Sequence, residues 1–504
     1  MLGYAGSKPA GIYPGFKSLL DCRIKIDWSL RRYRFTREKS MTVARQLAER
    51  ILAPKFQDLP AEALHWAKIG ILDTVGVTIA GASERCTAIT AATPGIAESD
   101  GPAVLFGLAR RTSVLDAVLI NGVASHALDY DDVNNQIGGH PSVPLVPAIF
   151  AVADMVDISG EEAIAAYVAG FEVETQIGLA VHYQHYAKGW HPTATLGIFG
   201  TVAAGARLLG LNVDQTAQAL ALAVSLASGV KANFGTMTKP LHIGHSLRNG
   251  VMAVLMARDG FTANEAAFEH KQGFFEVFNG SDAYDASKIF DDWGTPWNVT
   301  DPGPSLKAYP CCGSTHGAID CALALHHDHA LELEDIAKID IRTDPKRLPH
   351  TDNPDPTSGL GAKFSIQYVV ARALINGAVR LGDFENAAYD DREARDLMMK
   401  VSAGVHPDMN DPNTDTYAAE VTIIMSDGRE LSHRSGDVVL RGPGRPMDEE
   451  TLFGKFADCM QRQLPGEAPR PLYEMLLHLE TLSRLSAVTD YLAAIEPSGT
   501  MAAE

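Results

Sequence analysis

The chain repeats a short motif in which a proton-transfer or cationic residue precedes a proline. The motif reads His140-Pro141-Ser142 and His191-Pro192-Thr193, with further forms at Lys239-Pro240 and at Tyr309-Pro310, where Lys307 lies just upstream. Proline suits the first turn of a helix, and the residue before it is kept out of the α region. We therefore expect each His or Lys just ahead of a buried helix, beside the positive end of its dipole. Converging helix starts of this kind would form a pocket for a small anion.

An acidic segment, "SHALDYDDVNNQIGGH", leads into His140. It places Asp129, Asp131 and Asp132 at the expected end of a helix, where carboxylates oppose the dipole and cost stability unless cations meet them. One interpretation is a carboxylate that orients or charges a neighbouring His or Lys. The other is a solvated acidic turn.

A third stretch, "GTMTKPLHIGHSLRNG", is dense in cations. His242 and His245 are three residues apart and share a helix face, with Arg248 three residues further on. Such a row is costly against an apolar bundle unless it meets acids or an anionic ligand. Pairing with Asp129–Asp132, without a ligand, is the alternative.

Two other chemistries fit less well. "GHSLR" (244–248) is close to the G-x-S-x-G nucleophile elbow of serine hydrolases, with Ser246 as nucleophile, but Arg248 replaces the final glycine and no buried strand precedes it. A zinc cluster could draw on closely spaced thiols and imidazoles, namely Cys311, Cys312, His316, His326, His327 and His329. A small-residue turn before a helix that ends in histidines explains that pattern as well, and we predict no metal.

The composition is that of a globular protein, with 46% hydrophobic and 21% charged residues in a chain of 504. That length predicts at least two domains. A formal net charge of −19 disfavours a nucleic-acid partner, and no uninterrupted apolar stretch reaches the ~20 residues of a membrane span. Six cysteines in so long a chain form no disulfide framework. We expect a cytoplasmic protein without a nucleic-acid or membrane partner.

Residues 1–40 differ from the rest of the chain, because they hold nine basic and three acidic residues. They lack the apolar region of a secretory signal. We expect a poorly ordered N-terminal extension, with a transit-like extension as the alternative. The regular pattern begins at Met41.

From Thr42 to about Ala286, apolar residues recur at three- and four-residue spacing, and many are small, which predicts closely packed helices. The pattern changes after Pro302-Gly303-Pro304: "IAKIDIRTD" (336–344) alternates like a strand, and "AEVTIIMSDGRELSHRS" is typical of a hairpin that turns at Asp427-Gly428. Two helical runs separate them. We predict a mainly α fold: a large all-helical domain (41–302), an inserted α+β lid domain (303–441), and C-terminal helices (442–504) that rejoin the helical domain.

Several of these segments together resemble the MmgE/PrpD superfamily. They are "HALDYDD" followed by "HPS", "GWHPTATLGIFGTVAAGARLLGL", "TKPLHIGHS", "KAYPCCGSTH" and "FSIQY", and they occur in order between about Met41 and the C-terminus. The superfamily contains 2-methylcitrate dehydratases, cis-aconitate decarboxylases and an iminodisuccinate epimerase. The resemblance implies a homodimer with a cofactor-free site in the cleft between the helical domain and its lid.

By position, the resemblance assigns Asp129, His140, His191, Lys239 and Lys307 to the site of the decarboxylase branch. It implies that His140 and His191 are an acid/base pair oriented by Asp129, and that Lys239, counted with the catalytic residues, and Lys307 hold substrate carboxylates. Cys312 stands where that branch has a His, and His350 where it has a Tyr. We place these two residues, with His242 and His245, among the substrate-binding residues.

The implied function is that of a cofactor-free lyase acting on a small di- or tricarboxylate. Dehydration or decarboxylation would proceed by proton transfer beside a carboxylate, through an enolate-like state that basic groups stabilise. A histidine with a near-neutral pKa is suited to move that proton. An epimerase of an iminodisuccinate-like acid is the alternative, and a serine hydrolase using Ser246 is a remoter one.

Overall fold

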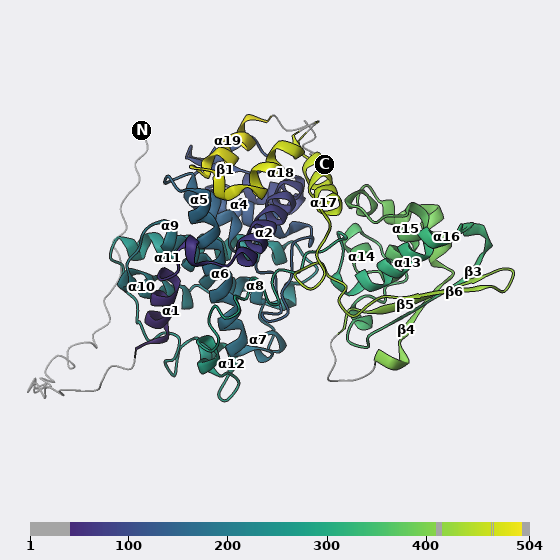
Figure 1. Cartoon of the computed structure of the whole chain (residues 1–504), viewed down its shortest axis with the longest axis horizontal. Coiled ribbons are helices and arrows are strands. Elements are labelled where there is room, and N and C mark those ends of the chain that lie inside the picture. Colours follow the sequence, from purple (N-terminus) through teal and green to yellow (C-terminus); the bar gives the residue numbers. More distant parts are fainter. Residues whose placement is uncertain (1–40, 410–415, 465, 467, 496–504) are drawn as a thin grey trace, which may run out of the picture. The chain divides into compact units, whose positions relative to one another are not determined.

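The computed structural model describes residues 41–409, 416–464, 466 and 468–495, so the predicted extension of residues 1–40 lies outside the described residues. Helices dominate from residue 42 to residue 279 (Figure 1). Those of this part are α1 Val43–Leu52, α2 Ala61–Ala80, α3 Arg85–Ala92, α4 Val114–Ala127, α5 Val146–Ala153, α6 Gly160–Val181, α7 Gln184–Ala187, α8 Pro192–Thr195, α9 Gly197–Leu208, α10 Val213–Val224, α11 Thr238–Arg258 and α12 Phe274–Asn279. A short hairpin, β1 Ala103–Leu105 and β2 Arg110–Thr112, was not predicted.

Capping explains where two of the core helices begin. Ser159 and Glu162 form a capping box at the start of α6, and Asn212 and Gln215 form one at the start of α10. By length and hydropathy α6 could also cross a membrane, but 94% of its apolar window is buried inside the protein. Packing against the other helices therefore explains the apolar composition of α6.

The helical pattern predicted up to about Ala286 is interrupted at residues 261–273, which are not helical, and the next helix, α12, begins at Phe274. Pro-containing starts also differ from the expectation. Helix α5 begins five residues after Pro141, at Val146, whereas Lys239 lies inside the first turn of α11 rather than ahead of it. Of the four motif positions, His191 alone is a helix N-cap followed by proline, at the four-residue helix α8.

Residues 336–434 contain a four-stranded sheet in the order β4-β3-β5-β6. Its strands are β3 Ile336–Thr343, β4 Val401–Val405, β5 Ala419–Met425 and β6 Glu430–Arg434. Strand β3 pairs parallel with β4 and antiparallel with β5, with Ile341 opposite Val421. The predicted strand at 336–344 and the hairpin turning at Asp427-Gly428 are confirmed.

Four helices accompany this sheet: α13 His316–Asp328, α14 Gly359–Lys363, α15 Ile366–Asn376 and α16 Arg392–Met398. Alternate residues of β5, including Val421 and Ile423, are buried, and they pack in one apolar cluster with residues of α13 and α15. The alternation therefore marks the face that these helices cover.

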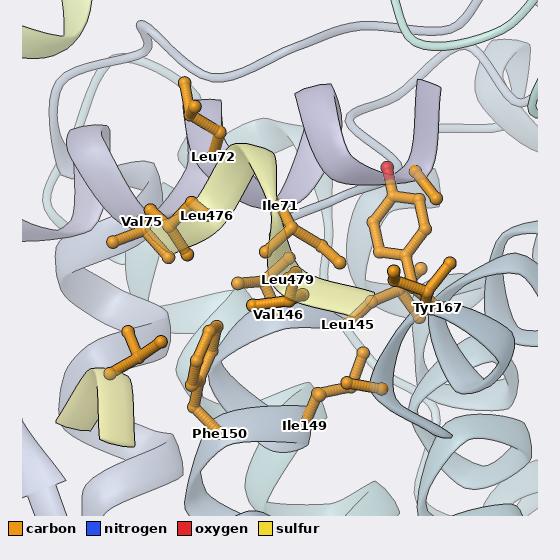
Figure 2. Close-up of a cluster of buried hydrophobic side chains, with 14 of the residues drawn as sticks. Ile71, Leu72, Val75, Leu145, Val146, Ile149, Phe150, Tyr167, Leu476 and Leu479 are labelled. Atoms are coloured by element: carbon orange, nitrogen blue, oxygen red, sulfur yellow. The ribbon is translucent and has the colours of Figure 1, made fainter. Parts of the chain in front are cut away.

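The chain ends in three helices, α17 Glu449–Gln461, α18 Pro469–Leu477 and α19 Ser486–Ala494. Helices α17 and α18 contact α2, and α19 contacts α5. Figure 2 shows the resulting core, in which Leu476 and Leu479 pack with residues of α2, α5 and α6. The fold is mainly α-helical with small sheets, as predicted, whereas the exact domain bounds and the lid stay predictions.

Candidate active site

The site is built around the turn that ends α4. Helix α4 leaves carbonyl oxygens at its negative end, and Asp129 adopts a positive φ of 54° just beyond it. Three buried lysines donate to consecutive carbonyls of this turn: Lys363 to Leu128 O (2.6 Å), Lys307 to Asp129 O (2.6 Å) and Lys455 to Tyr130 O (3.0 Å). Cationic side chains therefore contact the acidic segment, which agrees with the interpretation of a carboxylate beside a neighbouring Lys rather than with that of a solvated acidic turn.

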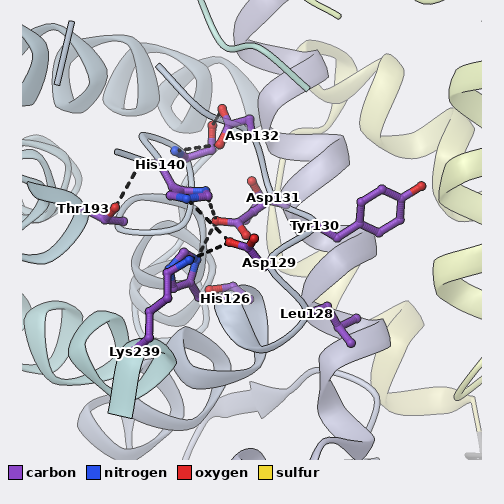
Figure 3. A network of polar contacts seen from close by, with 12 residues as sticks. His126, Leu128, Asp129, Tyr130, Asp131, Asp132, His140, Thr193 and Lys239 are labelled. Carbon is purple, nitrogen blue, oxygen red and sulfur yellow. Dashed lines mark hydrogen bonds and ion pairs between the residues drawn. The ribbon is translucent and has the colours of Figure 1, made fainter. Parts of the chain in front are cut away.

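The carboxylate of Asp129 joins two lysines from different parts of the chain (Figure 3 shows its contact with Lys239). Its Oδ1 lies 2.6 Å from Lys239 Nζ and its Oδ2 lies 3.0 Å from Lys307 Nζ. Burial alone would raise the pKa of Asp129, but the charges of Lys239, Lys307 and His140 hold it well below its usual range. Burial opposes the charge of Lys307 as well, yet the nearby carboxylates raise its pKa. Two ammonium groups against one carboxylate leave a net positive charge.

Asp131 and Asp129 both lie near His140. Asp131 Oδ2 lies 2.9 Å from His140 Nδ1 and 2.8 Å from His126 Nδ1, whereas Asp129 Oδ1 lies 3.8 Å from His140 Nε2 (Figure 3). Burial would raise the pKa of Asp131, but the two imidazoles keep it well below its usual range. Asp131 therefore lies closer to His140 than Asp129 does, and the shorter contacts of Asp129 are with the lysines. The orienting role of Asp129 stays a prediction.

His191 lies deeper beside these groups. Its Nδ1 is 3.1 Å from His242 Nδ1, and its ring stacks on that of His126 with centroids 5.5 Å apart. Burial, followed by the charge of His126, lowers the pKa of His191 well below its usual value. His191 is therefore neutral near pH 7, and its lowered pKa departs from the near-neutral value expected of a residue that moves the proton.

A cavity of about 580 Å³ collects most of the predicted site residues. Its lining includes Asp129, His140, His191 and Lys239 from the helical part, and Lys307, Cys312 and His350 from the part that carries the sheet. Burial raises the pKa of the Cys312 thiol, so it is neutral. His350 Nε2 lies 2.9 Å from Ser314 Oγ. Asp129 and His350, which are 221 positions apart in the sequence, thus line the same cavity.

Two predicted residues do not line this cavity. His242 reaches it only through His191. His245 is exposed and bonds to Asn249 one turn along α11, with 3.0 Å between His245 Nε2 and Asn249 Nδ2. The structure therefore does not place His245 with the substrate-binding residues, although a three-residue spacing put it on the face of His242.

The structure contradicts the alternative hypothesis of a serine hydrolase. Ser246 lies inside α11, where its hydroxyl donates to Ala194 O at 2.9 Å. A nucleophile elbow needs a sharp turn between a strand and a helix. No such turn surrounds Ser246, because residues 238–258 are continuous helix.

In the described part of the chain, the group with metal-ligand spacing is His126, Asp131 and His140, whose ligand atoms lie within 4.8 Å of one another. Asp131 Oδ2 hydrogen-bonds His126 Nδ1 at 2.8 Å and lies 2.9 Å from His140 Nδ1, so the three groups already contact one another. Cys311 instead contacts Thr315, with 3.3 Å between Sγ and Oγ1. The absence of a metal stays a prediction.

Sequence reasoning missed His126, Lys363 and Phe234. Phe234 packs edge-on against His191, with ring centroids 4.8 Å apart, and lies under Lys239 Nζ at 5.3 Å. A histidine in the last turn of α4 suits the helix dipole by itself. For that reason, local pattern offered no sign that His126 contacts the site.

The fold and the site define a mainly helical protein with a cationic cavity equipped for acid–base chemistry. Comparison with known proteins then gives its family. The MmgE/PrpD N-terminal domain matches residues 45–287 and the MmgE/PrpD C-terminal domain matches residues 309–480, so the chain belongs to the MmgE/PrpD family. The predicted family is confirmed.

Relatives in this family carry two named activities. Human cis-aconitate decarboxylase is 27% identical over 462 residues, which cover 87% of this chain and 94% of that protein. A cis-aconitate decarboxylase of Aspergillus terreus is 26% identical over 463 residues, covering 86% and 92%. The 2-methylcitrate dehydratase of Salmonella typhimurium is 24% identical over 306 residues, covering 57% and 61%. These names agree with the predicted MmgE/PrpD-type enzyme.

Proposed function

We propose that this protein is a lyase that acts on a small tricarboxylate by proton transfer beside a carboxylate. The single observation that carries the proposal is the cavity in which His140, His191, Lys239 and Lys307 meet. A space of about 580 Å³ suits a small ligand. The likeness to the decarboxylases supports decarboxylation first, because it extends over more of the chain than the likeness to the dehydratases.

Substrate binding depends on the two lysines. Lys239 and Lys307 bind a substrate carboxylate, and Asp129 holds both ammonium groups in place through its two oxygens. The same positive charge stabilises the enolate-like state, since charge that develops next to a preorganised cation is stabilised in a buried site. Residues 303–441 act as a lid, contributing Lys307, Cys312 and His350 to the cavity.

Proton transfer falls to the histidines. His140 faces the cavity beside Asp129, and His191 lies on the other side of the His126 ring. In decarboxylation, the electron pair of the broken C–C bond stays on the substrate as carbon dioxide leaves, and one histidine donates a proton to the product as general acid. In dehydration, one histidine removes a proton from the substrate as general base and the other donates a proton to the leaving hydroxyl group as general acid. The neutral thiol of Cys312 and the exposed imidazole of His350 contact the part of the substrate held by the lid. Epimerisation of an iminodisuccinate-like acid uses the same groups and is the alternative.

The test is incubation of the protein in heavy water with cis-aconitate, 2-methylcitrate and iminodisuccinate-like acids, followed by NMR. Release of carbon dioxide or water identifies decarboxylation or dehydration, whereas deuterium uptake alone identifies epimerisation. No change in any of these acids would contradict the proposal.

Lys239→Met supplies the first prediction. Removing the ammonium that contacts Asp129 should lower kcat/KM by about 10²–10³-fold, because one charge-stabilising contact of this kind is worth that much. Lys338→Met, a half-exposed lysine on strand β3, is the matched control and should keep the wild-type rate. Equal rates for the two variants would remove Lys239 from the site.

We also propose that the protein is a cytoplasmic homodimer. Light scattering of the purified protein measures its mass in solution and so tests the dimer.

A further inference from the structure

One carboxylate oxygen of Asp131 contacts two imidazole rings. His126 Nδ1 and His140 Nδ1 lie 2.8 Å and 2.9 Å from the same Oδ2, and all three side chains are buried (Figure 3). An ionised carboxylate can only accept hydrogen bonds. The hydrogen bond between His126 and Asp131 therefore places the hydrogen of that ring on Nδ1. His140 Nδ1 makes no hydrogen bond of standard geometry, but an unprotonated Nδ1 would hold its lone pair 2.9 Å from the negative carboxylate, so this Nδ1 carries the hydrogen as well. His140 is then left with an unprotonated Nε2, on the side where Asp129 and the cavity lie.

His126 occupies the space between the two histidines of the cavity. Its ring meets His140 edge-on with centroids 4.6 Å apart, and it stacks on His191 at 5.5 Å with an interplanar angle of 27°. Its Nε2 is buried without a hydrogen-bond partner among the described residues. A buried polar atom left in this way costs free energy, so packing of the three rings must hold His126 in place.

The charge balance of the trio favours His140 as the proton acceptor. Burial lowers the pKa of His126 to about 4, against the opposing effect of Asp131, so His126 is neutral at pH 7. Only its Nδ1 hydrogen is directed at the carboxylate. The negative charge of Asp131 is therefore available to stabilise an imidazolium at His140, which is the role of the carboxylate in a catalytic His–Asp pair.

We propose that His126 and Asp131 are positioning residues that hold His140 in the tautomer whose Nε2 moves the proton. The inference rests on the proposed function. In decarboxylation, carbon dioxide leaves, the electron pair of the broken C–C bond stays on the substrate as the enolate-like state, and an imidazolium at His140 donates its Nε2 proton to the substrate carbon. In dehydration or epimerisation, Nε2 instead takes the proton from a substrate carbon, the electron pair of the broken C–H bond stays on the substrate, and His140 becomes an imidazolium. Asp131 then faces that imidazolium, while Lys239 and Lys307 face the substrate charge.

Asp131→Asn tests the pair directly. The amide keeps the shape but loses the charge and can present a donor, so His140 loses its fixed tautomer. We expect kcat to fall by about 10²–10⁴-fold with KM changed less than about threefold. Asp132→Asn is the matched control. Asp132 is the residue directly after Asp131, is equally buried, and contacts Ser142 rather than a histidine. Its kcat should stay within about threefold of wild type.

His126 is tested with a pair of variants. His126→Leu removes the donor to Asp131 and should lower kcat by about tenfold or more, as loss of a supporting contact does. His126→Asn offers an amide donor close to the Nδ1 position and should recover part of that loss. Equal kcat values for both variants and the wild type would overturn the assignment to His126.

A readout that needs no turnover separates this inference from the proposed function. NMR of protein labelled with ¹⁵N-histidine, with the His140 signals identified by their loss in His140→Gln, should show hydrogen on Nδ1 in the wild type and a mixture in Asp131→Asn. A wild-type His140 with hydrogen on Nε2 overturns the inference even where the enzyme is active. Inactivity towards every acid, with the Nδ1 tautomer present, overturns the proposed reaction alone.

Discussion

At the residue scale, three carboxylates within four positions have three different surroundings. Asp129 meets lysines, Asp131 meets histidines, and Asp132 meets the hydroxyl of Ser142 at 2.6 Å, which in turn contacts Tyr167. No cation lies within ion-pair distance of Asp132 among the described residues, and burial raises its pKa to about 8. Side-chain surroundings therefore assign ionised carboxylates to the site and a protonated one to the core.

The stability of Asp132→Asn should depend on pH in a defined direction. The folded protein holds a proton on Asp132 that the unfolded chain releases above its ordinary pKa near 3.8. Wild-type stability therefore falls as pH rises from about 4 to about 8. Because the amide has no such proton, the melting temperature of the variant should gain on that of the wild type between pH 5 and pH 8. If the melting temperature of the variant minus that of the wild type stays constant or falls over that range, the raised pKa is contradicted.

At the element scale, the close crossing of α4 and α11 sets the distance between Asp129 and Lys239. A Cβ added at Gly244 of α11 would lie 2.3 Å from the Leu119 carbonyl oxygen of α4, and one added at Gly122 would lie 2.7 Å from Gly244 Cα. Only glycine lets these two backbones approach so closely. The first turn of α11, which carries Lys239, is thereby brought to the end of α4.

Gly244→Ala should consequently lower the free energy of unfolding by about 2 kcal/mol or more, because the methyl group meets backbone that cannot move aside. Gly454→Ala in α17 is the matched control, since nothing lies within 4 Å of its added Cβ. That variant should gain about 0.5–1 kcal/mol from helix propensity. Urea unfolding of both variants measures the effect, and a neutral Gly244→Ala would show that the crossing is not tight.

At the scale of the whole molecule, the cavity joins the helical part to the part that carries the sheet. Lys307 and Lys363 reach from residues beyond 302 to the end of α4, and Cys312 and His350 complete the lining. An anion bound there contacts both parts at once. Binding should therefore restrain both, because a ligand stabilises every element that its binding orders.

Hydrogen exchange of the full chain with and without citrate, a tricarboxylate probe, checks this expectation. Amide protection should increase at the end of α4, at the start of α11 and around residues 312–316 and 347–350 together. Lys239→Met should lose the protection in all of these segments. Protection confined to the helical part would show that citrate binds without contact to the proposed lid.

Local pattern was sufficient for most of the elements. Long helices and strand β3 follow from apolar periodicity, and the hairpin follows from Asp427-Gly428 between two alternating runs. Strand β4 was missed because "VSAGV" is short and has little alternation, and it becomes a strand only by pairing with β3. The three-residue strands β1 and β2 are below what periodicity can detect.

The sequence by itself determined which side-chain types the site contains, since the acidic turn and the His and Lys residues that precede prolines are visible in the chain. Only the tertiary structure decided their partners. Asp129 and Asp131 are two positions apart and chemically identical, yet the turn beyond α4 directs one towards Lys239 and Lys307 and the other towards His126 and His140. The physical reason is that hydrogen bonds and charge contacts act over about 3 Å, whereas the residues that make them lie up to 325 positions apart.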